Sequence, residues 1–417
     1  MPTLTRRNFL IASGGAGAAA IAAGATGVTW QQLMRSAASN PLPAGEQVLV
    51  VLTLYGGNDG LNTLVPYADA AYHSARPDLA YTPEEVQKLD GEFGLNPAMA
   101  GFAKLWQQHQ LAIVRGVGYP EPDHSHFRSM DIWQTAAPQS PVNTGWIGRW
   151  LDATGDDPLR AVNIGSVLPP LVLGAKASAA ALPLGRQRTA PKPLSTALMA
   201  MSQPDPTDSP SRALVCSSFA ADHQVDSTFA TVLSPNSTGE QTDQQSPAGS
   251  GGGQGSLADQ LAVVAKCITA GVPTRVYSVS QGGFDTHADE KDAQKNALDM
   301  VDKAVSAFLT AIGGTARGKD VTLMMYSEFG RRVQANASQG TDHGTAGPMF
   351  VAGPRVKGGY YGDQPSLTDL DNGDLKVTTD FRAVYAELLD KVLGADPTQI
   401  VGSPSSFINK QGEVSFL

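Results

Sequence analysis

Cysteine is scarce in this chain, and its scarcity excludes two kinds of site. The 417 residues include only two cysteines, Cys216 and Cys267. Two thiols are too few for a disulfide framework, and an all-cysteine zinc site needs four. The two cysteines could pair, or Cys267 could be a buried thiol on an apolar helical face. Any bound metal would therefore be held mainly by histidine and carboxylate side chains.

Charge is also low, and positive charge is dispersed. Charged residues make up 17% of the chain, the formal net charge is -9, and Lys and Arg form no cluster beyond isolated pairs. Nucleic-acid binding needs a concentrated cationic face, so we expect no nucleic acid as a main partner. The chain has 44 Gly and 28 Pro, which indicates many loops, while 41% hydrophobic residues are enough for a large buried core.

The N-terminus lacks acidic residues and any strongly apolar run of about 20 residues, the length that spans a membrane. Residues 5–10 (TRRNFL) carry an arginine pair and precede a soft Ala/Gly-rich stretch, which is typical of a twin-arginine export signal. We therefore predict a signal peptide over 1–38, export to the periplasm, cell envelope or exterior, and contact with the twin-arginine translocase. Cleavage could follow the small residues Ala23 and Ala25, or Ser36 and Ala38. No stable membrane span is expected after cleavage, with a retained anchor as the alternative.

Apolar runs alternate with amphipathic segments along the rest of the chain. Strands are predicted at 47–55, 111–117, 275–279, 321–326 and 349–352, and helices at 96–108, after Ser256 and around 298–312. The alternation predicts an α/β fold, a three-layer α/β/α sandwich with a mostly parallel central sheet. Residues 45–417 would form this single domain, with a flexible insertion rich in Ser, Pro and Gly at about 203–255.

Side chains that bind metals follow the predicted strands. They occur at four strand ends and before a fifth strand, namely Asp59, the group Asp123, His124 and His126, then Asp285 with His287, Glu328, and finally Asp342 with His343. The carboxyl ends of parallel strands meet at one edge of a sheet, so these groups can converge there. Carboxylate oxygen mixed with imidazole nitrogen suits Zn, Mn or Fe better than Ca.

Each of these groups has an ordinary structural alternative. Asp59 could be a turn residue or a helix cap, and His124 and His126 could be surface residues of a loop. Glu328 could form an ion pair with Arg331 or Arg332 on the following turn. Their joint occurrence along one sheet favours a site over these separate roles.

Four motifs carry a resemblance to a known family. They are Tyr55–Asn62, Gly283–His287, Ser327–Arg331 and Thr341–Gly344. With the twin-arginine leader they resemble domain-of-unknown-function family 1501, and the order of the residues resembles the alkaline-phosphatase superfamily. The chain departs from that superfamily in having no Cys/Ser-x-Pro-x-Arg element and no histidine after His343.

The resemblance implies an alkaline-phosphatase-like fold and roles for single residues. Asp59 would be an early metal ligand, Asp285 and His287 would hold one cation, and Asp342 and His343 would hold a second. The cofactor would be one or two divalent ions, Zn or Mn. His124 or His126 could fill a missing ligand position, or the site could hold one metal ion or none. Ser125 would be the nucleophile, with Ser129 in reserve, and Arg331 or Arg115 would clamp an anion.

Two function classes follow from these residues. The first is an exported metal-dependent hydrolase or transferase that acts on small anionic phosphate or sulfate esters through a metal-activated Ser or water. The alternative is a non-catalytic exported binding or assembly protein with a degraded metal site. A metal-free serine hydrolase is disfavoured because no Gly-x-Ser-x-Gly elbow occurs. A P-loop ATPase is disfavoured because Asp320 follows Lys319 where Ser or Thr is needed.

Overall fold

The structure is a computed structural model that describes residues 28, 30–155, 157–184, 255–403, 405, 407 and 414–417. The predicted insertion at 203–255, together with Cys216, lies outside the described residues except for Gly255. The arginine pair of the predicted leader also lies outside them. Only the last part of the predicted leader, from Val28 onward, can be placed in the fold.

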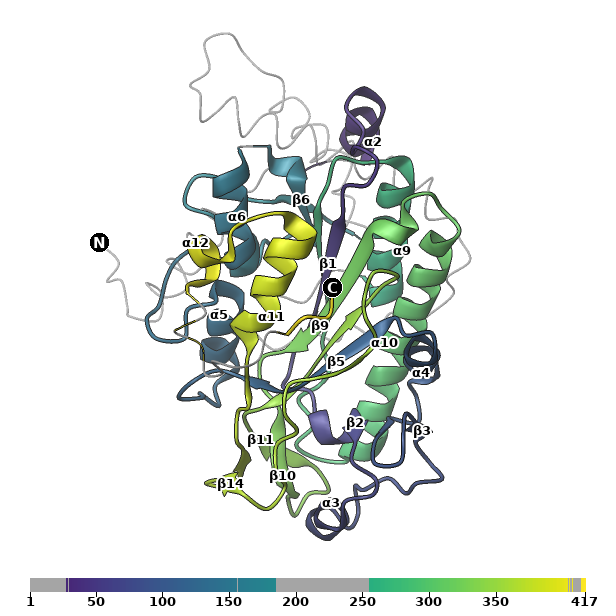
Figure 1. The fold of residues 1–417 in the computed structure, drawn as a ribbon, viewed down its shortest axis with the longest axis vertical. Helices are drawn as coiled ribbons and strands as arrows, with labels where there is room; N and C mark the ends of the chain where they lie inside the picture. The colour runs from purple at the N-terminus through teal and green to yellow at the C-terminus, as the bar shows by residue number, and fades with distance from the viewer. Residues whose placement is uncertain are drawn as a thin grey trace, which may run out of the picture.

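One large sheet forms the centre of the part of the chain that the structure describes (Figure 1). Its nine strands run β13-β5-β12-β9-β1-β8-β6-β7, with β16 pairing β5. Strand β12 is antiparallel to both β5 and β9, and the other pairings in this sheet are parallel. The prediction of a mostly parallel sheet is therefore confirmed. The strands are β1 Val48–Leu54, β5 Leu111–Gly118, β6 Ala161–Ile164, β7 Ala180–Leu182, β8 Val276–Gln281, β9 Val321–Ser327, β12 Gly347–Ala352, β13 Gly359–Tyr361 and β16 Thr379–Asp380.

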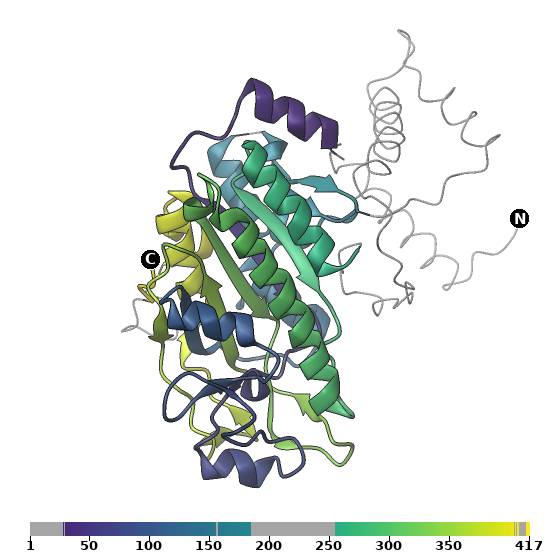
Figure 2. The same cartoon turned by 90° about the vertical axis from the view of Figure 1, so that its right-hand side faces the viewer.

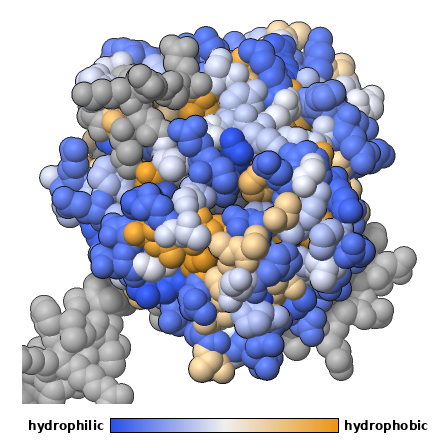
Figure 3. Space-filling view, turned by 60° about the horizontal axis from the view of Figure 1, so that its bottom comes forward, coloured by the Kyte–Doolittle hydropathy of each residue, from blue (hydrophilic) through white to orange (hydrophobic). Residues whose placement is uncertain are grey.

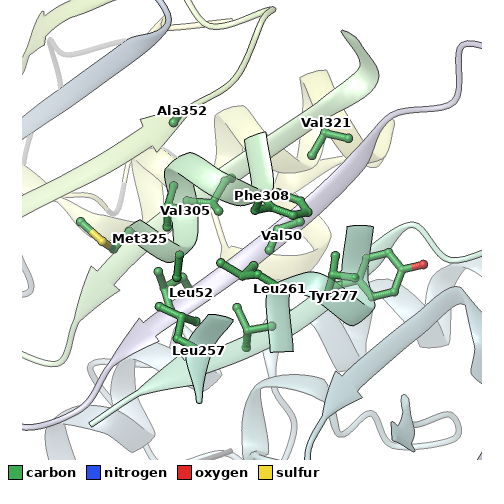
Figure 4. Packing of buried hydrophobic residues seen from close by; sticks show 14 of the residues in the cluster. Val50, Leu52, Leu257, Leu261, Tyr277, Val305, Phe308, Val321, Met325 and Ala352 are labelled. Carbon is green, nitrogen blue, oxygen red and sulfur yellow. The ribbon is translucent and has the colours of Figure 1, made fainter. Parts of the chain in front are cut away.

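Strand β1 is buried on both faces, which explains its continuous apolar sequence. Because side chains alternate along a strand, Val50 and Leu52 belong to one hydrophobic cluster, whereas Leu49 and Val51 belong to the cluster on the opposite face. Figure 4 shows Val50 and Leu52 near residues of α9 and α10. The sheet therefore separates two cores.

Helices cover both faces of this sheet (Figure 2). One face carries α4 Ala100–Gln107, α9 Leu257–Ala270 and α10 Glu290–Gly313, and the other carries α5 His126–Thr135, α6 Trp146–Thr154, α11 Phe381–Leu388 and α12 Pro397–Val401. The predicted three-layer sandwich is thus confirmed. A π-helical segment, Leu389–Leu393, continues α11. Short 3₁₀ turns lie at η1 Gly60–Asn62, η2 Pro158–Arg160, η3 Pro170–Val172 and η4 Gly318–Asp320.

Most of the predicted elements have the expected place, and two differ. Ser256 caps α9 as predicted, because its hydroxyl oxygen accepts a hydrogen bond from the Asp259 N–H at 3.2 Å. The helix predicted from Asn96 begins at Ala100, since the Asn96 side chain instead closes a turn by accepting from the Ala98 N–H. His126, expected in a loop, is the first residue of α5.

Helix α2, Trp30–Ser39, packs against α9 at the end of the predicted leader. Leu33 is 0% exposed, and the Val28 N–H donates to the Ala181 carbonyl oxygen of β7 at 3.0 Å. Cleavage after Ala38 would remove these contacts, whereas cleavage near Ala25 would keep them. Among the described helices, none has both the length and the apolar character that crossing a bilayer requires.

Small sheets lie beyond the carboxyl ends of β1, β8 and β9, at the bottom of Figure 1. They are the pair β10 Arg331–Ala335 and β11 Thr341–His343, the pair β14 Leu370–Asp371 and β15 Asp374–Leu375, and the set β2 Leu64–Val65, β3 Gln87–Lys88 and β4 Gly94–Leu95. Helix α3, Ala70–Ala75, lies at the same end. Strands β10, β11 and β15 carry some of the side chains described next, among them Arg331, His343 and Asp374.

Candidate metal centre

The loops that follow β1 and β8 touch closely because glycine follows β1. The two strands are parallel neighbours that end at Leu54 and Gln281. Gly56 has φ +119°, and a Cβ atom on it would lie 2.4 Å from the Asp285 backbone nitrogen. A larger residue could neither adopt this conformation easily nor fit the gap. The glycine pair therefore brings Asp285 to the edge of the sheet beside the end of β1.

Four predicted ligands converge at this point, three imidazoles and one carboxylate. Asp285 Oδ1 lies 3.5 Å from His126 Nε2, 3.1 Å from His287 Nε2 and 3.2 Å from His343 Nε2. The His287 and His343 Nε2 atoms are 2.9 Å apart. The donor atoms of His126, Asp285 and His343 also all lie within 4.8 Å of one another.

These spacings fit a shared cation. Zinc binds imidazole nitrogen at about 2.0–2.1 Å, which places the donors of a tetrahedral site about 3.3 Å apart. The four separations given above, 2.9 to 3.5 Å, bracket this value. The His126 Nε2 atom is buried and has no hydrogen-bond partner. A buried imidazole nitrogen without a partner needs an explanation, and a metal ion would supply the missing contact.

The Nδ1 atoms of His126 and His343 point away from Asp285, and each lies within hydrogen-bond distance of an acceptor oxygen. His126 Nδ1 lies 2.8 Å from Glu328 Oε1, and His343 Nδ1 lies 2.8 Å from the His124 carbonyl oxygen. A carbonyl only accepts, so the His343 proton is on Nδ1, and the Glu328 carboxylate assigns the His126 proton in the same way. Both Nε2 lone pairs then face Asp285. Such outer contacts orient metal-binding imidazoles in proteins.

The surroundings of His126, His343 and Asp285 shift their pKa values in different directions. The hydrogen bond to Glu328 raises the pKa of His126, although burial opposes it. Burial, followed by the positive charge of Arg331, lowers the pKa of His343, so this ring is neutral at pH 7. Burial would raise the pKa of Asp285, but the hydrogen bond and charge of Arg331 hold it below its ordinary value. A neutral imidazole and an ionised carboxylate are the forms that bind a cation.

Glu328 contacts the cluster only through His126 and does not contribute a donor atom to it. It is 1% exposed, and its carboxylate accepts hydrogen bonds from the Gly56 N–H at 2.9 Å, the Ser327 hydroxyl at 2.9 Å and His126. The alternative of an ion pair with Arg331 or Arg332 is not observed among the ion pairs of the described residues. Glu328 therefore positions His126, which corrects its predicted role as a metal ligand.

Arg331 has a different role from the predicted anion clamp. Its side chain is 0% exposed, and its nitrogens donate to the carbonyl oxygens of Gly56, Gly57, Phe284 and Thr341 and to Asp285 Oδ1. All three guanidinium nitrogens thus donate to acceptors inside the protein. The guanidinium holds the loops after β1 and β8 together and orients Asp285, so it cannot reach a substrate.

Asp59 is likewise removed from the cluster. Its carboxylate is fully buried in an ion pair with Arg76, whose Nη2 lies 3.0 Å from Asp59 Oδ1. It also caps η1 by accepting from the Leu61 N–H at 3.2 Å. Burial favours the neutral acid, yet the Arg76 charge holds the pKa of Asp59 below its ordinary value. The cap alternative is correct, and the predicted metal ligand is not available here.

The other two predicted ligands lie at the rim. The His124 side chain is turned toward Asp374, with Nε2 3.0 Å from Asp374 Oδ2, and only its carbonyl oxygen reaches the cluster. The Asp342 side chain is 61% exposed, and its Oδ1 lies 3.7 Å from His287 Nδ1. Neither side chain therefore contributes a donor to the four-atom cluster. Asp374 was not predicted, and no local pattern singles it out apart from the Asn372-Gly373 turn before it.

The predicted nucleophile and its reserve have different environments. Ser125 is exposed and is the N-cap residue of α5, immediately before His126, and its side chain makes no capping bond. Ser129 is 0% exposed and is occupied, since its hydroxyl donates to the Glu328 carbonyl oxygen and accepts from Tyr119. The Arg115 guanidinium stacks 4.9 Å from the Tyr360 ring and donates to the Gly362 carbonyl oxygen. Of the two serines, Ser125 alone remains accessible.

Several solved structures are similar to this chain at low identity. They include a protein of the alkaline phosphatase superfamily from Vibrio parahaemolyticus, with 12% identity, TM-score 0.42, and coverage of 90% of this chain and 77% of that one. A phosphonate monoester hydrolase from Silicibacter pomeroyi has 11% identity, TM-score 0.36, and coverage of 87% and 78%. An alkaline phosphatase from the Antarctic bacterium TAB5 has 10% identity, TM-score 0.32, and coverage of 75% and 92%. No curated protein sequence matches the chain.

A family of sequences covers nearly the whole described domain. The family described as "Protein of unknown function (DUF1501)" matches residues 46–405, which include β1, the candidate metal centre and α12. The match agrees with the resemblance carried by the four sequence motifs. The chain therefore belongs to the DUF1501 family.

Proposed function

We propose that this protein is an exported, metal-dependent hydrolase or transferase that acts on small phosphate or sulfate esters. The observation that carries the proposal is the convergence of His126, Asp285, His287 and His343, with the far nitrogens of two rings already bonded. This donor set suits a transition-metal ion such as Zn or Mn. The end of the molecule that carries it has a mixed surface, on which hydrophilic residues surround an area of hydrophobic residues (Figure 3).

Each residue of the centre would have a separate role in the hydrolysis or transfer reaction. A bound divalent cation would supply Lewis acidity, which lowers the pKa of a nearby hydroxyl group and offsets negative charge on the ester. Ser125, exposed beside His126, or a water molecule would be the attacking group. Arg331 would keep Asp285 ionised and aimed at the centre. Glu328 would hold His126 with its Nε2 lone pair facing the centre.

Metal content tests the first part of this proposal. The folded protein is purified without chelator, and its metals are measured by elemental analysis for the wild type, Asp285→Asn and His343→Ala. Both substitutions should lower the bound metal, because each removes one of the converging donors. His109→Asn is a matched control, since His109 is an exposed histidine that precedes β5 at the other end of the sheet. Wild-type protein without metal, even after incubation with Zn²⁺ and Mn²⁺, would refute the proposal.

Substrate screening tests the second part. Aryl phosphates, phosphodiesters and aryl sulfates are offered to the metal-loaded protein, with Ser125→Ala compared with the wild type. Loss of turnover in Ser125→Ala at unchanged metal content would identify Ser125 as the nucleophile. Retained turnover in this variant would identify water as the attacking group.

A second candidate function is a non-catalytic exported binding protein, and two observations favour it. Asp59 is paired with Arg76, and Arg331 donates to backbone carbonyl oxygens, so one predicted metal ligand and the predicted anion clamp are occupied within the protein. A protein that retains stoichiometric metal but turns over none of the ester classes would support this candidate. Turnover that follows the metal content would exclude it.

Export is a separate part of the proposal and rests on residues 5–10. Replacing Arg6 and Arg7 with Lys should keep the protein in the cytoplasm, where cell fractionation would detect it with its leader attached. Unchanged export of this variant would contradict a twin-arginine route.

A further inference from the structure

We propose that Asp374 is a positioning residue of the metal centre, acting through His124 on the orientation of His343. Asp374 lies on β15, outside the motifs that suggested the site. This inference rests on the proposed metal-dependent function, because it assigns a role within the same centre. It is carried by a chain of three contacts between the β15 hairpin and the donor atoms.

The first contact joins the hairpin to the loop before α5. Asp374 Oδ2 lies 3.0 Å from His124 Nε2, and Asp374 is 5% exposed, while the His124 side chain is 42% exposed. The loop residues from Glu121 to Ser125 are all exposed. Hydrogen bonds within the loop shape it, including Ser125 N–H to Asp123 Oδ1 at 2.7 Å. The pair with Asp374 ties this exposed loop to a buried carboxylate on another element.

The next two contacts lead from the loop to the centre. The His124 carbonyl oxygen accepts the His343 Nδ1–H at 2.8 Å, and His343 Nε2 lies 3.2 Å from Asp285 Oδ1. The direction of the His124 carbonyl therefore decides which nitrogen of His343 carries the proton and where its lone pair points. Because Asp374 holds the ring of the same residue, it restricts rotation of that carbonyl. Outer contacts of this kind orient metal-binding histidines.

The surroundings of Asp374 are unfavourable for a role limited to stability. One of its oxygens, Oδ1, is buried without a hydrogen-bond partner and has only Arg332 Nε at 3.6 Å. Burial raises the pKa of Asp374, which reports the cost of keeping the carboxylate there. Replacing this carboxylate with an apolar side chain leaves no buried charge behind, because its partners His124 and Arg332 have side chains that are 42% and 40% exposed. Asp374 is a buried carboxylate paired with a largely exposed histidine. We infer that the pair is retained because it fixes the position of His124.

The experiment compares metal affinity with the stability of the metal-free protein. Zn²⁺ affinity is measured by competition with a chromophoric chelator, Co²⁺ absorption spectra report the ligand geometry, and thermal melts are recorded in EDTA. Asp374→Leu removes the acceptor and keeps the volume, and Asp374→Asn keeps an oxygen that can accept from His124. Asp371→Leu is the matched control, because Asp371 is exposed and lies on β14 of the same hairpin.

We expect Asp374→Leu to bind Zn²⁺ about tenfold more weakly, at the lower end of the range for outer contacts, and to alter the Co²⁺ spectrum. Its metal-free melting temperature should not fall, and Asp374→Asn and Asp371→Leu should bind like the wild type. His124→Ala should show the same loss, and the double variant should lose no more than either single variant. The His124→Ala variant tests the same contact if Asp374→Leu does not fold.

Two results would overturn the inference and are distinguishable. Unchanged Zn²⁺ affinity in folded Asp374→Leu or His124→Ala, beside a wild type that binds Zn²⁺, would refute the role of Asp374 alone. A wild type that binds no Zn²⁺ would refute the proposed function and this inference together.

Discussion

Glu290 offers a test of the buried charges beneath the candidate centre, and the pH dependence of stability is the quantity to measure. It is the first residue of α10 and is 0% exposed. Its Oε2 accepts from the Thr341 hydroxyl, and its Oε1 has no hydrogen-bond partner. Burial, and then the negative charge of Asp59, raise the pKa of Glu290 to about 9 from an ordinary value of 4.5. The native protein therefore carries a neutral carboxylic acid at this position.

The sign of the effect follows from which state binds the proton. Between pH 4.5 and about 9 the folded state keeps the Glu290 proton, whereas the unfolded chain has lost it. The folded state then binds more protons, so the free energy of unfolding falls as pH rises through this window. The slope is at most about 1.4 kcal/mol per pH unit. Over two units the loss would reach about 3 kcal/mol, a sizeable part of a typical total stability.

Glu290→Gln removes this titration and keeps an oxygen that can accept from Thr341. We expect the variant to be more stable than the wild type at pH 8, with an advantage that shrinks steadily toward pH 5. Urea unfolding at four pH values in the presence of EDTA measures the difference, and titrations common to both proteins cancel. Glu84→Gln, which changes an exposed glutamate, is the control and should show no such trend.

A difference between Glu290→Gln and the wild type that does not change with pH would refute the reasoning. It would mean that Glu290 is ionised in the folded protein and that Arg76 compensates both carboxylates. The same measurement on the double variant Asp59→Asn, Glu290→Gln would then separate the two acids. That variant leaves Arg76 buried without a charge partner and should lose several kcal/mol at every pH, as expected for breaking a buried pair.

Further substitutions test the packing and the support of the centre. Leu33→Ala should cost about 2–5 kcal/mol in urea unfolding, since Leu33 is fully buried, and a chain that starts at residue 39 should melt at a lower temperature than one that starts at residue 28. Glu328→Gln should weaken Zn²⁺ binding about 10–100-fold in a chelator competition, because it disturbs the acceptor of His126. Arg331→Met should lower both the melting temperature and the metal affinity, because it leaves several carbonyl oxygens and Asp285 without their donor. Phe127→Ala, at a position 65% exposed, should stay within about 0.5 kcal/mol of the wild type.

The layers of the fold could be predicted because they follow from local patterns. Strand β1 is apolar throughout since both of its faces are buried, and α10 shows its buried face in the spacing of its apolar residues. The start of α4 was predicted three residues early, at Pro97 and not at Ala100, because Asn96 resembles a helix cap but closes a turn instead. Strands β6 and β7 and helices α5, α6 and α11 were not predicted, since they are short or follow irregular segments.

The site residues that could be predicted are those that follow or end a strand, because a strand end fixes where the next residues lie. Asp285, His287 and His343 follow or end strands at one edge of the molecule, and the structure brings them together. Whether a given acid faces that point depends on partners elsewhere in the chain. Asp59 follows β1 as expected, but Arg76, seventeen residues later, takes both of its oxygens. No local pattern reveals such competition, because it depends on the packing of α3 against β10.

Competition from partners within the protein also explains why three of the predicted site residues position other residues and do not bind a ligand themselves. Arg331 and Glu328 are adjacent to the centre but are buried, and a buried charged group must satisfy its hydrogen bonds inside the protein. Arg331 does so on the loops after β1 and β8, and Glu328 does so on Gly56 and His126. His124 turns its ring to Asp374 and leaves its carbonyl to His343. Among the donor atoms that face the centre, His126 Nε2 is the clearest candidate for binding a cation, because it is buried and has no hydrogen-bond partner.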